Sequence, residues 1–118
     1  MPYVDGFLLA VPRRKLALYR SISRRAGRIW KEYGALEYRE CVGDDVNIKM
    51  GRSFPKIAGQ RPGEVVVFSW IVYRSKAARN RINKKITQDP RIARMMTDAM
   101  PFDPKRMAMA GFKVIVDL

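Results

Sequence analysis

The chain has 118 residues, 47% of them hydrophobic, which indicates one globular domain with its own core and excludes a disordered or fibrous chain. It contains no histidine and a single cysteine, Cys41, which excludes histidine-dependent catalysis, histidine or multi-cysteine metal sites and intramolecular disulfides. Twenty-four Lys and Arg against eleven Asp and Glu leave a net charge of +13, which attracts polyanions.

The first half of the chain predicts a strand, a helix and a second strand. Residues 3–11 are rich in β-branched and aromatic side chains and end before a proline. Residues 13–33 place apolar side chains at helical spacing with basic ones on the opposite side, which predicts an amphipathic helix that Gly34 ends. Residues 36–42 have mixed polarity and predict a more exposed strand.

A long connection and a buried strand follow. Residues 44–63 contain two prolines and three glycines and predict an irregular segment, of a length typical of a lid or binding loop. Residues 65–73 (VVVFSWIVY) are almost continuously apolar, so we expect both faces of this strand to be covered.

The last part of the chain predicts two helices and a fourth strand. Ser75 is placed to cap a helix that runs to about residue 87, and the pair Asp89-Pro90 is typical of the start of another short helix. Residues 107–116 predict a strand with Gly111 as a candidate bulge.

The order of these elements, βαββαβ, predicts the ferredoxin-like plan in a single α+β domain over residues 1–118, with a four-stranded antiparallel sheet and two main helices on one face. The other face of the sheet is also apolar, and one copy of the chain leaves it uncovered. We therefore predict a homodimer in which two sheets pack face to face, a dimeric α+β barrel.

No targeting segment or membrane span is recognisable. The longest apolar runs are too short to cross a bilayer, and the first residues lack the basic and apolar stretches of a signal peptide. We expect a cytoplasmic protein without a membrane partner. Asp44 and Asp45 have no further carboxylate at ligand spacing, so neither a metal nor a cofactor is predicted.

Six segments of the chain are distinctive: YVDGF at 3–7, WKEYGALEY at 30–38, ECVGDD at 40–45, SFP at 53–55, VFSWIVY at 67–73 and MPFDPKRM at 100–107. Together they resemble the YbaA-like family of uncharacterised bacterial proteins. The resemblance covers essentially the whole chain in matching order. It implies a ferredoxin-like subunit of the dimeric α+β barrel superfamily, in agreement with the pattern of elements, but no reaction, because the family has no established one.

A small-molecule pocket between sheet and helices, where relatives in this superfamily hold ligands, is our first hypothesis for function, with an anion among the candidate ligands. Its predicted lining residues are Asp5, Trp30, Tyr38, Ser69, Trp70, Tyr73 and Arg106. Asp5 lies on an otherwise apolar strand and needs a partner, for which Arg106 is the candidate. A purely structural ion pair and plain packing of the aromatic residues are the alternatives. Five methionines within residues 95–109 suit a dimer core or an adaptable ligand surface.

Phosphate binding is the alternative hypothesis. Residues 1–34 have a net charge of +6 and residues 74–94 of +7, so these two stretches carry the whole surplus. Cations in the first turn of a helix, beside free backbone N–H groups, can hold a small anion; the candidates are Arg13, Arg14, Lys15, Lys76 and Arg79. The same helices could bind RNA or DNA, although no nucleic-acid motif is present, and a solvated basic face explains the same charges. Neither hypothesis assigns a catalytic residue.

Overall fold

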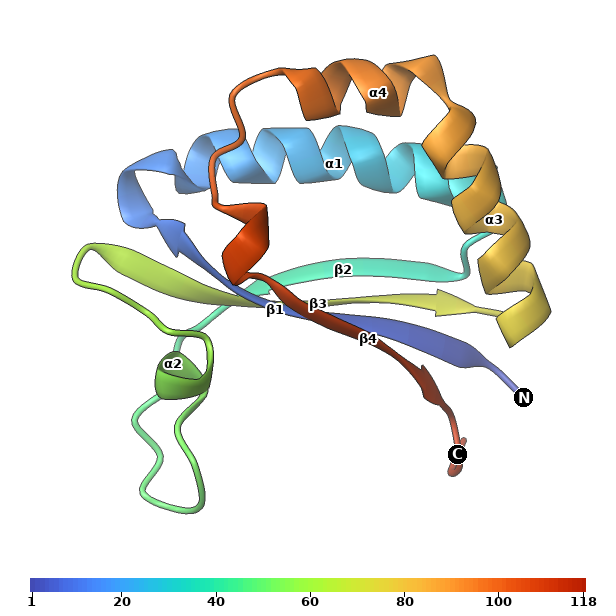
Figure 1. Cartoon of the computed structure of the whole chain (residues 1–118). Helices are drawn as coiled ribbons and strands as arrows, with labels where there is room; N and C mark the ends of the chain where they lie inside the picture. Colours follow the sequence, from blue (N-terminus) through green and yellow to red (C-terminus); the bar gives the residue numbers. More distant parts are fainter.

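A computed structural model describes all 118 residues and contains one four-stranded antiparallel sheet with three helices on one side (Figure 1). The strands are β1 (Tyr3–Pro12), β2 (Glu37–Val42), β3 (Glu64–Tyr73) and β4 (Ala108–Lys113), in the spatial order β2-β3-β1-β4. The two long apolar strands pair in the centre and the two shorter, more polar ones lie at the edges. The predicted α+β, ferredoxin-like sheet is confirmed.

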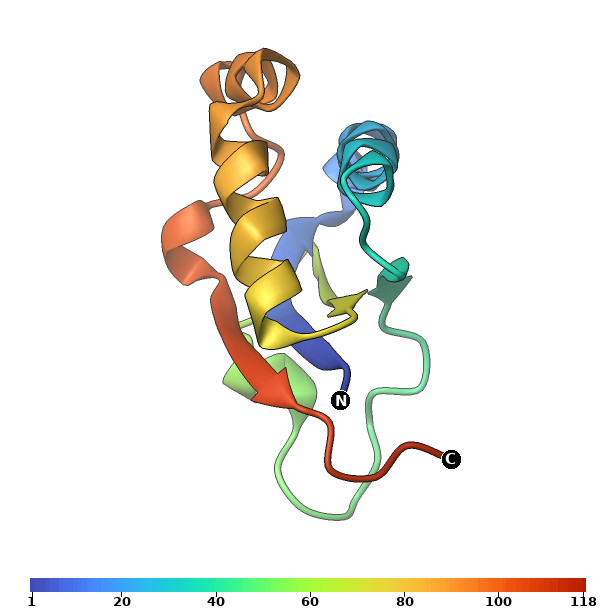
Figure 2. The same ribbon diagram turned by 90° about the vertical axis from the view of Figure 1, so that its right-hand side faces the viewer.

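The helices of this layer are α1 (Leu16–Glu32), α3 (Lys76–Gln88) and α4 (Pro90–Thr97). Figure 2 shows α1 at one edge of the helical layer and α3 and α4 at the opposite edge. The predicted first helix starts as a 3-10 turn over Arg13–Lys15 and becomes α-helical at Leu16. None of the helices combines the length and the apolar character that crossing a membrane requires.

The predicted helix ends are confirmed. The backbone of Gly34 has a φ of 115°, a left-handed conformation that glycine adopts without strain, directly after α1. The Ser75 hydroxyl accepts a hydrogen bond from the backbone N–H of Ala78 at the start of α3. The Asp89 carboxylate accepts one from the backbone N–H of Arg91 at the start of α4.

The long connection between β2 and β3 lies on the side of the sheet away from the other helices (Figure 1) and contains a one-turn helix, α2 (Phe54–Ile57). The ring centroid of Phe54 lies 5.8 Å from that of Phe68 on β3. The connection therefore packs against the outer face of the sheet, which an expectation based on its length alone did not anticipate.

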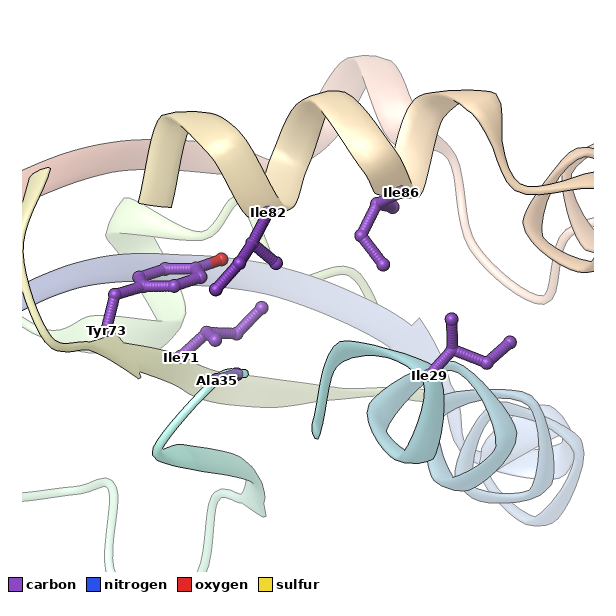
Figure 3. Close-up of a cluster of buried hydrophobic side chains, with 6 residues drawn as sticks. All are labelled: Ile29, Ala35, Ile71, Tyr73, Ile82 and Ile86. Carbon is purple, nitrogen blue, oxygen red and sulfur yellow. The ribbon is translucent and has the colours of Figure 1, made fainter. Parts of the chain in front are cut away.

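A compact apolar cluster joins the helices to the sheet around α3. Figure 3 shows Ile82 and Ile86 of α3 directed at side chains of β3, with Ile29 of α1 beside them. The cluster consists of Ile29, Ala35, Ile71, Tyr73, Ile82 and Ile86, all buried. A second buried cluster, at the other end of the central strands, consists of Leu9, Val11, Tyr19, Val65 and Val67.

The strand β4 is regular. Its register with β1 runs without interruption from Tyr3 opposite Lys113 to Leu8 opposite Ala108, so the suggested bulge at Gly111 is wrong. Gly111 instead leaves room for two side chains, because a Cβ atom there would collide with Arg79 and Tyr3.

The outer face of the sheet carries large apolar side chains that the connection covers only in part. By strand alternation this face takes Phe68, Trp70 and Val72 from β3, Val4 and Leu8 from β1, and Phe112 from β4. Phe68 is 42% exposed and Phe112 is 56% exposed. The expected second apolar face is therefore present in the single chain.

Candidate ligand-binding site

A cavity of about 720 Å³ lies between the helices and the inner face of the sheet. Nineteen of its 27 lining residues are hydrophobic, and all four strands and the helices α1, α3 and α4 contribute to it. The volume falls within the range of roughly 300–1,000 Å³ that is typical of small-molecule sites. Six of the seven predicted pocket residues line it: Asp5, Trp30, Tyr38, Ser69, Trp70 and Tyr73.

On one side of β3, Asp5 is held by two side chains of α3. Asp5 is only 3% exposed, and its carboxylate accepts hydrogen bonds from Arg79 Nε at 3.0 Å and Asn83 Nδ2 at 3.4 Å. Arg79 and Asn83 are four residues apart, so they lie on the same face of the helix. The Arg79 guanidinium also lies 5.0 Å from the ring centroid of Tyr3. The expected partner of Asp5 exists, but it comes from α3.

The hydrogen bonds continue from Asn83 into the cavity wall. Trp30 Nε1 lies 3.1 Å from the Tyr73 hydroxyl and 3.3 Å from Asn83 Oδ1, and the Tyr73 hydroxyl donates to Asn83 Oδ1 at 3.2 Å. Burial, and then the nearby charge of Asp5, raise the pKa of Tyr73 above its ordinary value and keep its hydroxyl protonated. No buried side-chain polar atom lacks a partner, so this side of the cavity is a closed network.

On the other side of β3, the carboxylate of Glu40 on β2 keeps hydrogen-bond acceptor positions that no protein group occupies. Its carboxylate accepts hydrogen bonds from the hydroxyls of Tyr19 at 2.7 Å and Tyr38 at 3.3 Å. Burial, and then the charge of Glu40, raise the pKa of both tyrosines above its usual range. Two donors leave a carboxylate with unused acceptor positions, and Glu40 is exposed and also lines a second hollow beside the cavity.

Gly27 of α1 sets the position of Tyr38. The tyrosine ring packs directly on the helix backbone, and a Cβ atom on Gly27 would lie 2.6 Å from Tyr38 Cε1. Any side chain at this position would push the ring away from α1. Glycine costs stability inside a helix, so its presence here reflects the close approach of α1 to β2.

Arg106 does not line the cavity, and its suggested pairing with Asp5 is wrong. Its Nη1 and Nη2 atoms each lie 2.7 Å from an oxygen of Glu64, and Nη2 also donates to the carbonyl of Gly59 at 2.8 Å. The strand register explains the error, because Gly111 lies opposite Asp5 and Arg106 precedes the strand in a 3-10 turn. Hydrogen bonding to Arg106 lowers the pKa of Glu64 to about 2.

Trp70 borders the cavity, but strand alternation turns its side chain to the outer face of the sheet. Its Nε1 lies 3.4 Å from Glu37, and its ring centroid lies 5.6 Å from that of Phe68. The indole is therefore unavailable to a molecule inside the cavity.

Sequence reasoning missed several lining residues. The polar ones include Tyr19, Ser23, Glu40 and Asn83, and the apolar ones include all five methionines within residues 95–109. The spacing of Tyr38 and Glu40, two apart on one strand, could have revealed Glu40, because such residues share a face. The methionines form part of the cavity wall, which favours the adaptable ligand surface over a dimer core.

The structure does not bring the five predicted anion-binding residues together. Arg13, Arg14 and Lys15 follow β1, and Lys76 follows β3, so they lie at opposite ends of an antiparallel pair. Arg79 is occupied by Asp5. The structure also contains no group of three or more Cys, Asp or Glu that could hold a metal ion.

The strand order and the helices on one face define a ferredoxin-like protein, here with a cavity of ligand size inside. Three solved structures share this fold. The cofactor-independent oxygenase SnoaB from Streptomyces nogalater has a TM-score of 0.62 at 12% identity, covering 99% of this chain and 96% of that one. Rv0793 from Mycobacterium tuberculosis has a TM-score of 0.61 at 12% identity, covering 99% and 98%. A dimeric ferredoxin-like protein from an uncultured marine organism has a TM-score of 0.56 at 11% identity, covering both chains fully.

The family follows from the sequence. The model of a family described as "Protein of unknown function (DUF1428)" matches residues 2–104. The Escherichia coli K12 protein described as "Uncharacterized protein YbaA" is 43% identical over 117 residues, which is 99% of each chain, and YbaA of Shigella flexneri matches equally. The chain belongs to the DUF1428 family, and its resemblance to YbaA is confirmed.

Proposed function

We propose that the protein binds a small, mainly apolar molecule in the cavity and holds a hydrogen-bond donor of that molecule at Glu40. The observation that supports this most is a carboxylate with unused acceptor positions in a lining that is mostly hydrophobic. Burying an unpaired donor is costly, so one open acceptor in an apolar cavity selects a ligand that carries a donor.

The charges at the cavity favour a neutral or cationic ligand over an anion. The charged lining residues are Asp5, Arg39 and Glu40. Asp5 is paired with Arg79, and Arg39 lies on the outer face by alternation, where it pairs with Glu37 at 3.4 Å. The unpaired charge in the lining of the cavity itself is therefore negative, although the chain as a whole has a net charge of +13 and Arg20 and Arg24 border the second hollow.

The shape of the lining favours a ring. Tyr19, Trp30 and Tyr38 offer flat aromatic surfaces, with the rings of Trp30 and Tyr38 6.1 Å apart. The methionines of residues 95–109 line the cavity as well, and flexible thioethers adapt to ligands of different outline.

We also propose that the protein is a homodimer that joins the outer faces of two sheets. Phe68 and Phe112 are about half exposed on an apolar face, and sheet-on-sheet packing is the ordinary way to bury such a surface. The solved neighbour described as a dimeric ferredoxin-like protein has the same fold. The cavity lies on the opposite face of the sheet, between the sheet and the helices, so the proposed dimer would not cover it.

Three naphthalene derivatives test the ligand class, because they share a ring system and differ in charge. We expect calorimetry at neutral pH to show binding of 1-naphthol and 1-naphthylmethylammonium and weaker binding of 1-naphthoate. Glu40→Gln keeps one acceptor oxygen but removes the charge, so the ammonium compound should lose about tenfold in affinity and the naphthol less. Tightest binding of the naphthoate would contradict the proposal.

A second pair of variants tests the place of binding. Ala26 lines the cavity, whereas Ala17 on the same helix is exposed and does not. Ala26→Phe should occupy part of the cavity and weaken naphthol binding, and Ala17→Phe should leave it unchanged. Equal binding by both variants would place the ligand elsewhere.

Sedimentation tests the dimer. Phe68→Glu places a charge on the outer face, and we expect it to convert a wild-type dimer to monomer at micromolar concentration. The matched control, Leu18→Glu, changes a residue of similar exposure on α1, 49% against 42%, and should remain a dimer. A monomeric wild type would contradict the proposed pairing of sheets.

A further inference from the structure

A row of cations follows the outer side of α1 and does not line the cavity, although two of its members, Arg20 and Arg24, border the second hollow beside it. At 100° per residue, Arg20, Arg24, Arg28 and Lys31 fall within an arc of roughly 80°. All four are exposed, and α1 lies at the edge of the helical layer, as Figure 2 shows. The row covers about 16 Å along the helix at a rise of about 1.5 Å per residue.

The fold itself makes little use of this row. The ion pairs of the structure involve Arg39, Arg79, Arg91 and Arg106. Arg20, Arg24 and Arg28 form neither an ion pair nor a side-chain hydrogen bond, and only Lys31 is engaged, through the carbonyl of Leu36 at 2.7 Å. Like charges four residues apart destabilise a helix, so the row opposes the stability of α1.

We propose that this row, Arg20, Arg24, Arg28 and Lys31, is a docking surface for the phosphate backbone of double-stranded nucleic acid. Charge complementarity supports the proposal, because a polyanion is the partner that relieves repulsion among unpaired cations. Three of the four residues are arginines, whose planar guanidinium donates two parallel hydrogen bonds to a phosphate.

The surroundings of the row favour nucleic acid over a membrane. A helix that binds at a lipid surface places apolar side chains in the bilayer beside its cations. Here Tyr19 and Ile29 of α1 are buried, and the exposed Leu18 falls outside the arc of the row. A lipid surface on the row would therefore meet cations alone.

The same surroundings favour a duplex over a single strand. Proteins that bind single strands without sequence preference stack bases on exposed aromatic rings. The exposed rings of this protein, Phe54, Phe68 and Phe112, belong to the outer side of the sheet, away from α1. The row offers phosphate contacts only, so binding should be independent of sequence.

Fluorescence anisotropy with a labelled duplex of about twenty base pairs tests the proposal between roughly 50 and 200 mM salt. With four phosphate contacts the logarithm of the association constant should fall with the logarithm of salt concentration with a slope of about −4. The variant R20Q/R24Q/R28Q should have a slope of about −1 and bind more than about tenfold more weakly at low salt. R20K/R24K/R28K keeps the charge, so its slope should equal that of the wild type, and its affinity should lie between those of the other two proteins because lysine cannot donate two parallel hydrogen bonds.

The matched control is K49Q/R52Q/K56Q, which removes the same charge from exposed residues on the other side of the sheet and should bind like the wild type. Equal losses in both triple variants would overturn the proposal in favour of diffuse net charge, as would the absence of duplex binding at low salt. Tighter binding to phosphatidylserine vesicles than to the duplex would assign the row to a membrane and also overturn it. Circular dichroism monitors folding, and naphthol binding should be the same in all variants.

Discussion

Two carboxylates reach the inner face of the sheet on either side of β3, and their surroundings differ. Asp5 is almost fully buried and accepts hydrogen bonds from Arg79 and Asn83, so its charge is paired inside the protein. Glu40 lines the cavity, is exposed to solvent and accepts hydrogen bonds from only two tyrosine hydroxyls. A carboxylate whose acceptor positions are filled by protein donors stabilises the fold. One with unused acceptor positions in an apolar cavity is available to a ligand.

The helix that faces each carboxylate causes the difference. Opposite Asp5, α3 presents Arg79 and Asn83 one turn apart. Opposite β2, α1 presents Tyr19, Ser23 and Gly27, which are all buried and become smaller along the helix. Arg20 and Arg24 of α1 border the second hollow together with Glu40, but neither forms an ion pair with it.

Asp5→Leu removes the buried carboxylate on the closed side and should cause the largest loss of stability among these variants. Removing one partner of a buried pair leaves Arg79 uncompensated, and we expect unfolding in urea to show a loss of about 3–5 kcal/mol. The double variant Asp5→Leu/Arg79→Leu should recover most of this loss, because it removes both charges. A double variant as unstable as the single one would contradict the pairing.

Gly27→Ala tests whether the close packing of Gly27 positions Tyr38 beside Glu40. The new Cβ atom would collide with the Tyr38 ring, and overpacking of this kind costs about 1–3 kcal/mol, which exceeds the gain of about 1 kcal/mol from replacing glycine in a helix. We expect a net destabilisation in urea and weaker 1-naphthol binding. Ser21→Ala, on the exposed side of the same helix, should have neither effect. A Gly27→Ala variant more stable than the wild type would contradict the close packing of Tyr38 on Gly27.

Glu64 provides a third case, in which the partner again comes from the protein. Hydrogen bonding to Arg106 lowers the pKa of Glu64 from 4.5 to about 2, so its contribution to stability is complete above about pH 4.5 and is lost as the pH falls toward 2. Glu64→Gln should therefore destabilise the protein near neutral pH and flatten its stability profile across that acid window. Glu37→Gln, at an exposed pair, should leave the profile unchanged. A profile that Glu64→Gln does not alter would contradict the pairing.

The fold was predictable because each strand and helix has its own local pattern. The apolar runs of β1 and β3, the two-sided pattern of α1 and the caps Ser75 and Asp89 each indicate one element without reference to the others. The direction taken by residues 44–63 was not predictable, since length and glycine content do not say which face of a sheet a connection will cover.

The site was predictable only where alternation or spacing fixes a direction. Ser69 and Trp70 are adjacent on one strand, so they cannot both point into one cavity, and only Ser69 does. The partner of Asp5 depends on the register between β1 and β4 and on how α3 crosses the sheet. Local sequence spacing reveals neither, which is why the sequence suggested Arg106 as the partner and gave no sign of Arg79.

Glu40→Gln should have the smallest effect on stability, about 1 kcal/mol or less, and yet it tests the open side most directly. The charge of Glu40 helps to raise the pKa of Tyr19 and Tyr38, and burial is the larger cause. Their protonated forms contribute stability that is complete below about pH 10 and is lost as the pH rises above it.

Absorbance of tyrosinate, followed with circular dichroism at each pH, measures the change. In the Gln variant two tyrosines should ionise at lower pH than in the wild type but still above their ordinary value, because burial remains. Asp5→Asn should instead affect Tyr73, the tyrosine on the closed side, whose pKa the charge of Asp5 raises. If Glu40→Gln left the titration of all tyrosines unchanged, Glu40 would not share the two hydroxyls, and the contrast between an occupied and an open carboxylate would fail.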